Sequence, residues 1–316
     1  MGSMEVLFLQ PVFQERIWGG TKLKTMFGYD IPSAHTGECW AVSAHPHGPS
    51  VVRNGPYAGL TLSELWTSQP QLFGSPAKRF PLLTKILDAS DDLSVQVHPA
   101  DDYAKLHEGG ELGKTECWYI VAADPGARII FGHRARTREQ YAALIEEGRW
   151  DELLADVPVQ AGDFFYVPSG TLHALGKGVV VLETQQSSDT TYRVYDYDRT
   201  DARGHKRELH VQQAIDVTTV PHEAAGVAYR VERIAGTEVT TYVSNGFFTV
   251  QKWNVAGLTE LAAPERYLIV SVLDGEGELQ AGGKFYSLRK GEHLIVPLGF
   301  GAFALDGRME LIVSHE

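Results

Sequence analysis

A short pattern of turn residues occurs twice in this chain. Residues 162–173 read GDFFYVPSGTLH, and residues 291–303 read GEHLIVPLGFGAF. In each segment a glycine is followed by five residues, a proline, one further residue and a second glycine. Glycine and proline interrupt strands, and the apolar run between them has the length of one strand. The pattern therefore indicates two copies of one β-unit in a single chain.

The two copies differ three residues after the second glycine. His173 occupies this position in the first copy, and Ala302 occupies it in the second. Because both copies keep the glycines and the proline, these residues serve the turn itself, and the turn forms without the histidine. We therefore expect a functional site that uses His173 in the first copy, and a degenerate unit without such a site in the second.

The rest of the chain favours a mainly β fold. From Val157 onward, apolar segments alternate with turn residues at intervals of about 8 to 12 residues, which is typical of an antiparallel sandwich or barrel. Apolar spacing predicts helical additions at 60–72, with Thr61 as the N-cap, and at 137–154, with a break near Gly148.

The composition of residues 221–228 is small and polar, which is typical of a linker. We therefore expect an N-terminal domain at 4–222 that carries the helical additions and the chemistry, and a C-terminal domain at 229–316. The residues ahead of Met4 read MGS, a sequence typical of an added leader, so Met4 is the expected native start.

Composition excludes several classes of partner. The formal net charge of −12 over 316 residues disfavours nucleic acid and anionic membranes, and an anionic substrate would need a local basic pocket. No apolar run reaches the roughly 18 residues of a membrane span, and no signal peptide is evident. Only two cysteines, Cys39 and Cys117, are present, which fits a reducing compartment. We expect a cytoplasmic protein.

Four side chains are candidates for a metal site. Gln96 and His98 are two residues apart in an apolar segment, so on a strand they project from the same face. Glu116 begins another apolar segment, and His173 follows the glycine-rich turn. Two imidazoles, a carboxylate and an amide oxygen suit a divalent first-row metal such as zinc. Five other histidines lack such context and are expected to be surface or structural residues: His45, His47, His107, His133 and His210.

Further charged residues lie inside apolar segments. Lys85 is alone in the run LLTKIL, where a buried ammonium needs a counter-charge that a substrate phosphate would supply. Lys114 precedes Glu116 by two residues and can share its strand face. Glu183 and Arg193 are ten residues apart, and the aromatic neighbours of Arg193 predict a half-buried strand with an anionic partner. Three nearby charged residues are expected to face solvent: Asp196, Asp198 and Arg199.

Together these segments resemble a known family. Residues 162–173 are similar to the second motif of the cupins, and SVQVHP, GKTECWYI, PSGTLHAL and ETQQSSDTTYRVYDYDR look like class I mannose-6-phosphate isomerases in their short bacterial form. The resemblance covers nearly the whole chain from about Val6. It implies two cupin (jelly-roll-like) β-barrels with helices added to the N-terminal half, and one zinc ion in the first barrel.

The resemblance also implies roles for individual residues. The zinc ligands would be Gln96, His98, Glu116 and His173, with Gln96 replaced by water in some members. The catalytic arginine of the family falls on Arg193, and its glutamate falls on Glu183. Substrate or phosphate contacts fall on three residues: Lys85, Ser94 and Lys114. Long members have a proline between the lysine and the glutamate, where this chain has Thr115.

The implied reaction interconverts mannose 6-phosphate and fructose 6-phosphate through an enediol-type intermediate. Arg193 would stabilise the developing negative charge, and the base would be Glu183, Lys114 or a metal-held water. Two alternatives stay open at this stage. One is a different metal-dependent cupin enzyme, such as a dioxygenase or another sugar-phosphate isomerase, and the other is a non-catalytic sugar-binding cupin. The expected partner is a small sugar phosphate, and the expected assembly is a monomer or homodimer.

Overall fold

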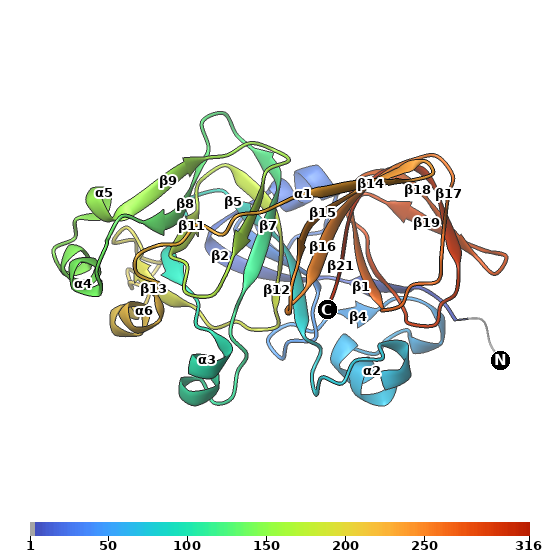
Figure 1. The fold of residues 1–316 in the computed structure, drawn as a ribbon, viewed down its shortest axis with the longest axis horizontal. Helices are drawn as coiled ribbons and strands as arrows, with labels where there is room; N and C mark the ends of the chain where they lie inside the picture. Colours follow the sequence, from blue (N-terminus) through green and yellow to red (C-terminus); the bar gives the residue numbers. More distant parts are fainter. Residues whose placement is uncertain (1–3) are drawn as a thin grey trace.

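The computed structural model describes residues 4–316, so the expected leader at residues 1–3 lies outside the described part. The chain is mainly β and forms two lobes (Figure 1). One lobe contains two sheets built from the first two thirds of the chain, and the other contains one large sheet. The fold class expected from the sequence is confirmed.

The first lobe pairs a six-stranded sheet with a five-stranded sheet. The strands at the middle of the six-stranded sheet, β5 (Leu82–Ala89) and β12 (Val179–Gln186), are buried along their full lengths, although both carry polar and charged side chains. In spatial order the six strands are β10 (Phe164–Val167), β7 (Glu116–Ala123), β12 (Val179–Gln186), β5 (Leu82–Ala89), β3 (Thr36–Val42) and β2 (Val12–Gly20). The five strands are β13 (Tyr192–Tyr195), β6 (Val95–Val97), β11 (His173–Leu175), β8 (Arg128–His133) and β9 (Leu154–Pro158).

The second lobe is a ten-stranded antiparallel sheet in which β21 (Phe303–His315) and β18 (Leu268–Ala281) form the longest pairing. Its first eight strands in order are β14 (Arg230–Ile234), β15 (Thr237–Ser244), β16 (Thr249–Ala256), β21 (Phe303–His315), β18 (Leu268–Ala281), β20 (His293–Val296), β1 (Leu7–Gln10) and β4 (Val51–Val52). Two further strands, β17 (Thr259–Leu261) and β19 (Lys284–Arg289), pair with β21 and β18.

The start of the chain joins the second lobe. Strand β1 pairs with β20, at Leu7 with Ile295, and also with β4 (Figure 1). One hydrophobic core cluster contains Leu7 and Ile86 together with Tyr267 and Ile312, so it spans both lobes. The expected division into domains at 4–222 and 229–316 stays a prediction, and two short strands of the first segment, β1 and β4, belong to the second sheet.

The predicted helical additions are present. Helix α2 (Leu62–Ser68) begins at Thr61, whose Oγ1 accepts from the Glu64 backbone N–H at 3.2 Å while the Glu64 carboxylate accepts from the Thr61 N–H at 2.8 Å. A 3-10 turn, η2 (Pro70–Leu72), follows. The second addition consists of α4 (Arg138–Glu146) and α5 (Trp150–Leu153), separated at Gly148, which has a φ of 65°.

Four short elements were not predicted from the sequence. Helices α1 (Lys22–Phe27), α3 (Asp101–His107) and α6 (Val211–Val217) contain six or seven residues each, and η1 (Gly55–Tyr57) contains three. Helices this short display less than two turns of apolar periodicity, and α3 and α6 each bury only an alanine. Within residues 4–316, no helix is long and apolar enough to cross a membrane.

The repeated turn pattern reflects a backbone requirement. Gly162 and Gly170 have φ values of 92° and 85°, and Gly291 and Gly299 have values of 88° and 79°. Residues with a side chain rarely adopt this left-handed region, so glycine is selected at all four positions. The apolar runs between these glycines form β10 and β20, which confirms that the two segments are copies of one β-unit.

Candidate active site

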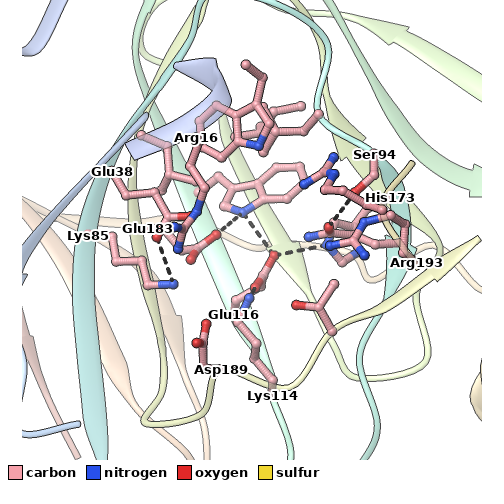
Figure 2. Close-up of a pocket in the computed structure, with 18 residues that line it drawn as sticks. Arg16, Glu38, Lys85, Ser94, Lys114, Glu116, His173, Glu183, Asp189 and Arg193 are labelled. Atoms are coloured by element: carbon pink, nitrogen blue, oxygen red, sulfur yellow. Dashed lines mark hydrogen bonds and ion pairs between the residues drawn. The ribbon is translucent and has the colours of Figure 1, made fainter. Parts of the chain in front are cut away.

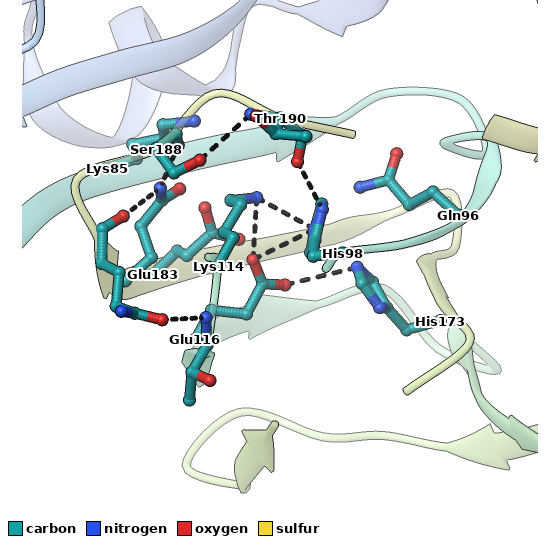
Figure 3. A network of polar contacts seen from close by, with 12 residues as sticks. Lys85, Gln96, His98, Lys114, Glu116, His173, Glu183, Ser188 and Thr190 are labelled. Atoms are coloured by element: carbon teal, nitrogen blue, oxygen red, sulfur yellow. Dashed lines mark hydrogen bonds and ion pairs between the residues drawn. The ribbon is translucent and has the colours of Figure 1, made fainter. Parts of the chain in front are cut away.

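A cavity of about 410 Å³ lies in the first lobe and is lined by strands of both its sheets (Figure 2). Its walls carry most of the residues singled out in the sequence. Those that line it directly are Lys85, Ser94, Gln96, Lys114, Glu116, His173, Glu183 and Arg193. His98 lies beside them and contacts Glu116 and Lys114 (Figure 3).

Three of the four predicted ligands converge. One ligand atom from each of His98, Glu116 and His173 lies within 4.8 Å of the others, and all three side chains are buried. Glu116 lies between the imidazoles: its Oε2 is 3.4 Å from His98 Nε2, and its Oε1 is 3.3 Å from His173 Nε2. Strand register accounts for the convergence, because β11 and β6 pair at His173 and Gln96, while the backbone carbonyl of His98 binds the Gly170 N–H at 2.8 Å.

The imidazoles are oriented for metal binding. His98 Nδ1 lies 2.9 Å from the Thr190 carbonyl, and His173 Nδ1 lies 2.8 Å from the Thr171 carbonyl. A carbonyl only accepts, so each Nδ1 carries the hydrogen and each Nε2 presents a lone pair toward Glu116. His173 Nε2 is buried and makes no hydrogen bond within residues 4–316. Burial lowers the pKa values of both histidines, and that of His98 falls to about 3. Two neutral imidazoles and a carboxylate fit a divalent transition metal.

Gln96 lies beside this triad, on the strand that pairs with His173. Its Oε1 accepts from Ser94 Oγ at 3.2 Å, and its backbone pairs with both His173 and Arg193. Figure 3 shows the Gln96 side chain on the same side as the two imidazoles. Its role as a fourth ligand therefore stays a prediction.

Lys114 is buried against the triad. Its Nζ is 2.8 Å from Glu116 Oε2 and 3.0 Å from His98 Nε2 (Figure 3). Burial disfavours the charged ammonium, but Glu116 and Glu183 outweigh burial and raise the pKa of Lys114. Lys114 therefore stays protonated and contributes a positive charge to the cavity.

Glu183 differs from Glu116 in its electrostatics. The Trp118 indole N–H is shared between them, 3.0 Å from Glu183 Oε2 and 3.1 Å from Glu116 Oε1. Burial and the neighbouring Glu116 raise the pKa of Glu183 to about 7, despite Lys114. Burial opposes ionisation of Glu116 also, but Lys114 and the histidines lower its pKa. Two adjacent carboxyls with pKa values moved apart are typical of sites that divide acid–base work.

Lys85 has a counter-charge in the protein itself. Its Nζ lies 3.6 Å from Glu38 Oε2 and 4.7 Å from the centre of the Trp40 ring. Glu38 also accepts from Arg16 at 2.9 Å, and although burial opposes it, Lys85 and Arg16 lower the Glu38 pKa to about 2. The burial of Lys85 therefore does not require a substrate phosphate, contrary to the argument from sequence.

Arg193 is half-buried in β13, as predicted, but no carboxylate of residues 4–316 forms an ion pair with it. Its Nη1 donates to the Glu208 carbonyl at 2.7 Å, and within residues 4–316 its buried Nε makes no hydrogen bond. The expected anionic partner is therefore not supplied by the described chain.

The structure also contradicts the expectation for Asp196. It was expected to face solvent, but its side chain is buried and holds two arginines: Arg199 at 2.6 Å and Arg207 at 2.7 Å. Asp198 is exposed as expected, whereas Arg199 is mostly covered. Of the five histidines set aside in the sequence, His45 and His133 are buried, and the His133 ring bonds the Thr219 carbonyl.

Sequence reasoning missed several cavity residues. Glu38 and Trp118 lie on strands β3 and β7, and Arg16 and Arg207 lie on β2 and in the loop before α6. The signal available for Trp118 was its i, i+2 spacing from Glu116, and Glu38 has the same spacing from Trp40. Arg207 sits in a polar loop and offered no such signal.

Comparison with known proteins agrees with this geometry. The family model described as "Phosphomannose isomerase type I, catalytic domain" matches residues 6–122, and the one described as "Mannose-6-phosphate isomerase, cupin domain" matches residues 238–316. The chain is 55% identical to mannose-6-phosphate isomerase ManA of Bacillus subtilis over 314 residues, which is 99% of each chain. The chain belongs to the type I phosphomannose isomerase family.

Other members of this family support the assignment. The mannose-6-phosphate isomerase of Streptococcus mutans is 55% identical over 98% of both chains. The crystal structure of the mannose 6-phosphate isomerase from Bacillus subtilis superposes with a TM-score of 0.98 at 51% identity, covering 99% of this chain and all of that one. A variant phosphomannose isomerase from Salmonella typhimurium, at 15% identity and a TM-score of 0.84, shares the fold.

Proposed function

We propose that this chain interconverts mannose 6-phosphate and fructose 6-phosphate with one bound zinc ion. The observation that carries the proposal is the buried triad of His98, Glu116 and His173, two members of which line a cavity that also carries arginine and lysine side chains. Relatives that are 55% identical bear the name of this activity. The proposal includes a cytoplasmic location, supported by two free buried cysteines, and action as a monomer or homodimer.

Isomerisation moves a proton between C1 and C2 of the sugar through an enediol-type intermediate. His98, Glu116 and His173, with Gln96 as the fourth ligand, would hold a divalent cation, which would supply Lewis-acid polarisation of the carbonyl oxygen. Arg193 and Lys114 add fixed positive charge in the same cavity, which stabilises the negative charge that develops on oxygen.

Glu183 is our preferred base. General-base catalysis is most effective when the pKa of the base lies near the working pH, and the Glu183 pKa is about 7. The raised pKa of Lys114 keeps its ammonium protonated, so this side chain suits an electrostatic role or proton donation. The Trp118 indole N–H fixes the Glu183 carboxyl at 3.0 Å.

Lys85 and Ser94 are proposed to bind the substrate from opposite walls. Figure 2 shows Lys85 beside Glu38 at one side of the cavity, and Ser94 near Arg193 and His173 at the other. Contacts on both sides of the sugar would fix its reacting carbons relative to Glu183 and the metal ligands.

The proposal is tested by a coupled assay from mannose 6-phosphate to fructose 6-phosphate. We expect turnover in the purified enzyme, loss after chelation and recovery when zinc is returned. The His173→Ala variant should lose both bound metal and turnover, because it removes one of three buried ligands. Full activity in metal-free protein, or oxygen consumption in place of isomerisation, would contradict the proposal.

A further inference from the structure

A second hollow, of about 750 Å³, lies in the first lobe outside the candidate active site. This outer hollow is formed by the turn between α4 and α5 together with residues of β8, β9, β11 and β13. Helices α4 and α5 lie at the end of the first lobe that is farthest from the second lobe (Figure 1). Among residues 4–316, only Leu175 lines both the outer hollow and the active-site cavity. Its volume is within the range of small-molecule sites, about 300–1,000 Å³.

The outer hollow lies behind strands that carry candidate active-site residues. On β11, His173 lines the active-site cavity and Ala174 lines the outer hollow, because successive residues of a strand point to opposite faces. On β13, Arg193 pairs with Gln96 and lines the cavity. A β-bulge follows, so Tyr195 pairs with the residue before Gln96 and lines the outer hollow instead.

Three of the lining residues are aromatic and contact one another. Trp150 and Tyr195 stack, with ring centres 4.3 Å apart and planes at 14°, and the ring centre of Tyr197 lies 4.8 Å from that of Tyr195. All three side chains are half-buried. Tyr197 also has a φ of 56°, which is uncommon for a bulky residue and marks a strained backbone of the kind that clusters at ligand sites. The hollow therefore has an apolar, aromatic wall that a ligand can cover.

The arginines of the outer hollow are paired with carboxylates. Arg128 Nε lies 3.3 Å from an Asp156 oxygen, and Arg149 Nη2 lies 2.6 Å from a Glu152 oxygen. The four side chains are about half exposed, so a ligand can reach them. Each pair offers N–H donors next to acceptor oxygens. A hydroxyl group both donates and accepts, so these pairs suit a ligand rich in hydroxyls.

The lining of the outer hollow disfavours anions. Beyond the two arginine–carboxylate pairs it includes Asp92 and Asp151, so its carboxylates exceed its guanidinium groups by two. This charge repels a phosphorylated sugar. An uncharged sugar avoids the repulsion, its hydroxyls fit the paired charges, and the C–H face of its ring can pack on an aromatic side chain.

We propose that the outer hollow is a second, non-catalytic site, and that it binds an uncharged sugar ring. Trp150 contacts the C–H face of the ring, and the two arginine–carboxylate pairs bind its hydroxyl groups. Because Ala174 and Tyr195 belong to β11 and β13, the bound sugar contacts the reverse side of the strands that carry His173 and Arg193. The inference goes beyond the proposed function, and it needs neither a bound metal nor isomerisation.

The test uses the full chain and methyl α-mannopyranoside, whose blocked anomeric carbon prevents it from opening to an aldose. Binding is followed by a ligand-observed NMR titration, and urea unfolding checks that each variant is folded. Trp150→Ala removes aromatic surface from the outer hollow. Phe285→Ala is the matched control, because Phe285 is an exposed aromatic residue on β19 in the second lobe.

In the parent we expect a Kd of about 1–10 mM, as suits a half-exposed site for a small ligand. Trp150→Ala should raise this Kd about tenfold, since the stacking surface is lost, and Trp150→Phe should stay closer to the parent. Arg128→Gln should raise it about threefold, because the pair with Asp156 is broken. This exposed change also keeps the test decisive if Trp150→Ala does not fold. Phe285→Ala should stay within about twofold of the parent.

Charged probes test the chemical class of the ligand. Methyl glucuronide should bind more weakly than the mannoside, because the lining carries excess negative charge. Glucosamine that binds at least tenfold more tightly than the mannoside would make the hollow a cation site and overturn the inference. No binding of the mannoside to the parent would overturn it also, as would an equal Kd in the parent, Trp150→Ala and Arg128→Gln.

Discussion

At the residue scale, the candidate metal ligands were accessible from sequence, whereas the ion-pair partner of Lys85 was not. The i, i+2 spacing of Gln96 and His98 and the turn before His173 are local patterns, so they survive without a structure. The ion pair of Lys85 with Glu38 depends on strand β3 lying against β5, where Trp40 is the register partner of Lys85. Cross-strand register is a tertiary property, which is why a counter-charge for Lys85 was sought in the substrate.

Glu183 gives a prediction at this scale. Glu183→Gln should lower kcat by about 10² to 10⁴, because the amide cannot accept the carbon-bound proton while it keeps an oxygen for the Trp118 N–H. In the parent enzyme the base acts as a carboxylate, so kcat/KM should fall as the pH drops through about 7. The variant should lack this acidic limb.

The measurement is a pH–rate profile together with metal content. Unchanged metal content in Glu183→Gln shows that the triad is intact. A variant that keeps the parent kcat, or one that keeps the same acidic limb, would exclude Glu183 as the base and leave the assignment to another group.

At the scale of elements, the strands and the longer helices could be predicted from the sequence, because their apolar spacing and their turn or cap residues recur along the chain. Helix α2 carries a capping box, and the break between α4 and α5 falls at a glycine with positive φ. Helices α3 and α6 are too short for periodicity to show. Asp196, Asp198 and Arg199 were expected to face solvent, since nothing local reveals that Asp196 is buried against Arg199 and Arg207.

The repeated turn supplies an element-scale prediction with its own control. Gly170 and Gly299 occupy equivalent positions with φ values of 85° and 79°, so an alanine at either should cost about 1–2 kcal/mol of backbone strain. At Gly170 the added Cβ would also lie 2.7 Å from Thr219 Oγ1 and 3.0 Å from the Val217 carbonyl, whereas at Gly299 its nearest neighbour is Met4 Cε at 3.7 Å.

We therefore expect Gly170→Ala to lower the free energy of unfolding more than Gly299→Ala does. Because the Gly170 N–H donates to the carbonyl of the proposed metal ligand His98 at 2.8 Å, only Gly170→Ala should also weaken metal binding. Urea unfolding and metal titration check both points. Equal effects on stability and metal binding in the two variants would show that the turn does not support the site.

At the scale of the whole molecule, the two lobes share a core and differ in chemistry. The fold repeats its turn glycines in both, while the polar triad is confined to the first. Sequence predicted this asymmetry from His173 and Ala302. It did not predict that β1 and β4 cross into the second sheet, since a strand of two to four residues has no marker of its partner.

His293 joins the lobes and gives the last prediction. Tyr29, from the first segment, places its hydroxyl 2.8 Å from His293 Nε2 and donates to the Gly291 carbonyl at 2.7 Å, while His293 Nδ1 lies 2.8 Å from Ser271 Oγ. Burial, with Arg53, lowers the pKa of His293 to about 3. The folded protein therefore holds this ring neutral at pH values where the unfolded chain protonates it, below about 6.5.

Since the unfolded state binds the extra proton between about pH 6.5 and 3, the stability that this histidine contributes is complete above 6.5 and is lost as the pH falls. The loss amounts to about 1.4 kcal/mol per pH unit. His293→Gln lacks the titration, so the difference in unfolding free energy between parent and variant should shrink by about 2 kcal/mol from pH 6 to pH 4.5. Urea unfolding at successive pH values measures it. A difference that stays constant over this range would mean that His293 is protonated in the folded protein as readily as in the unfolded chain.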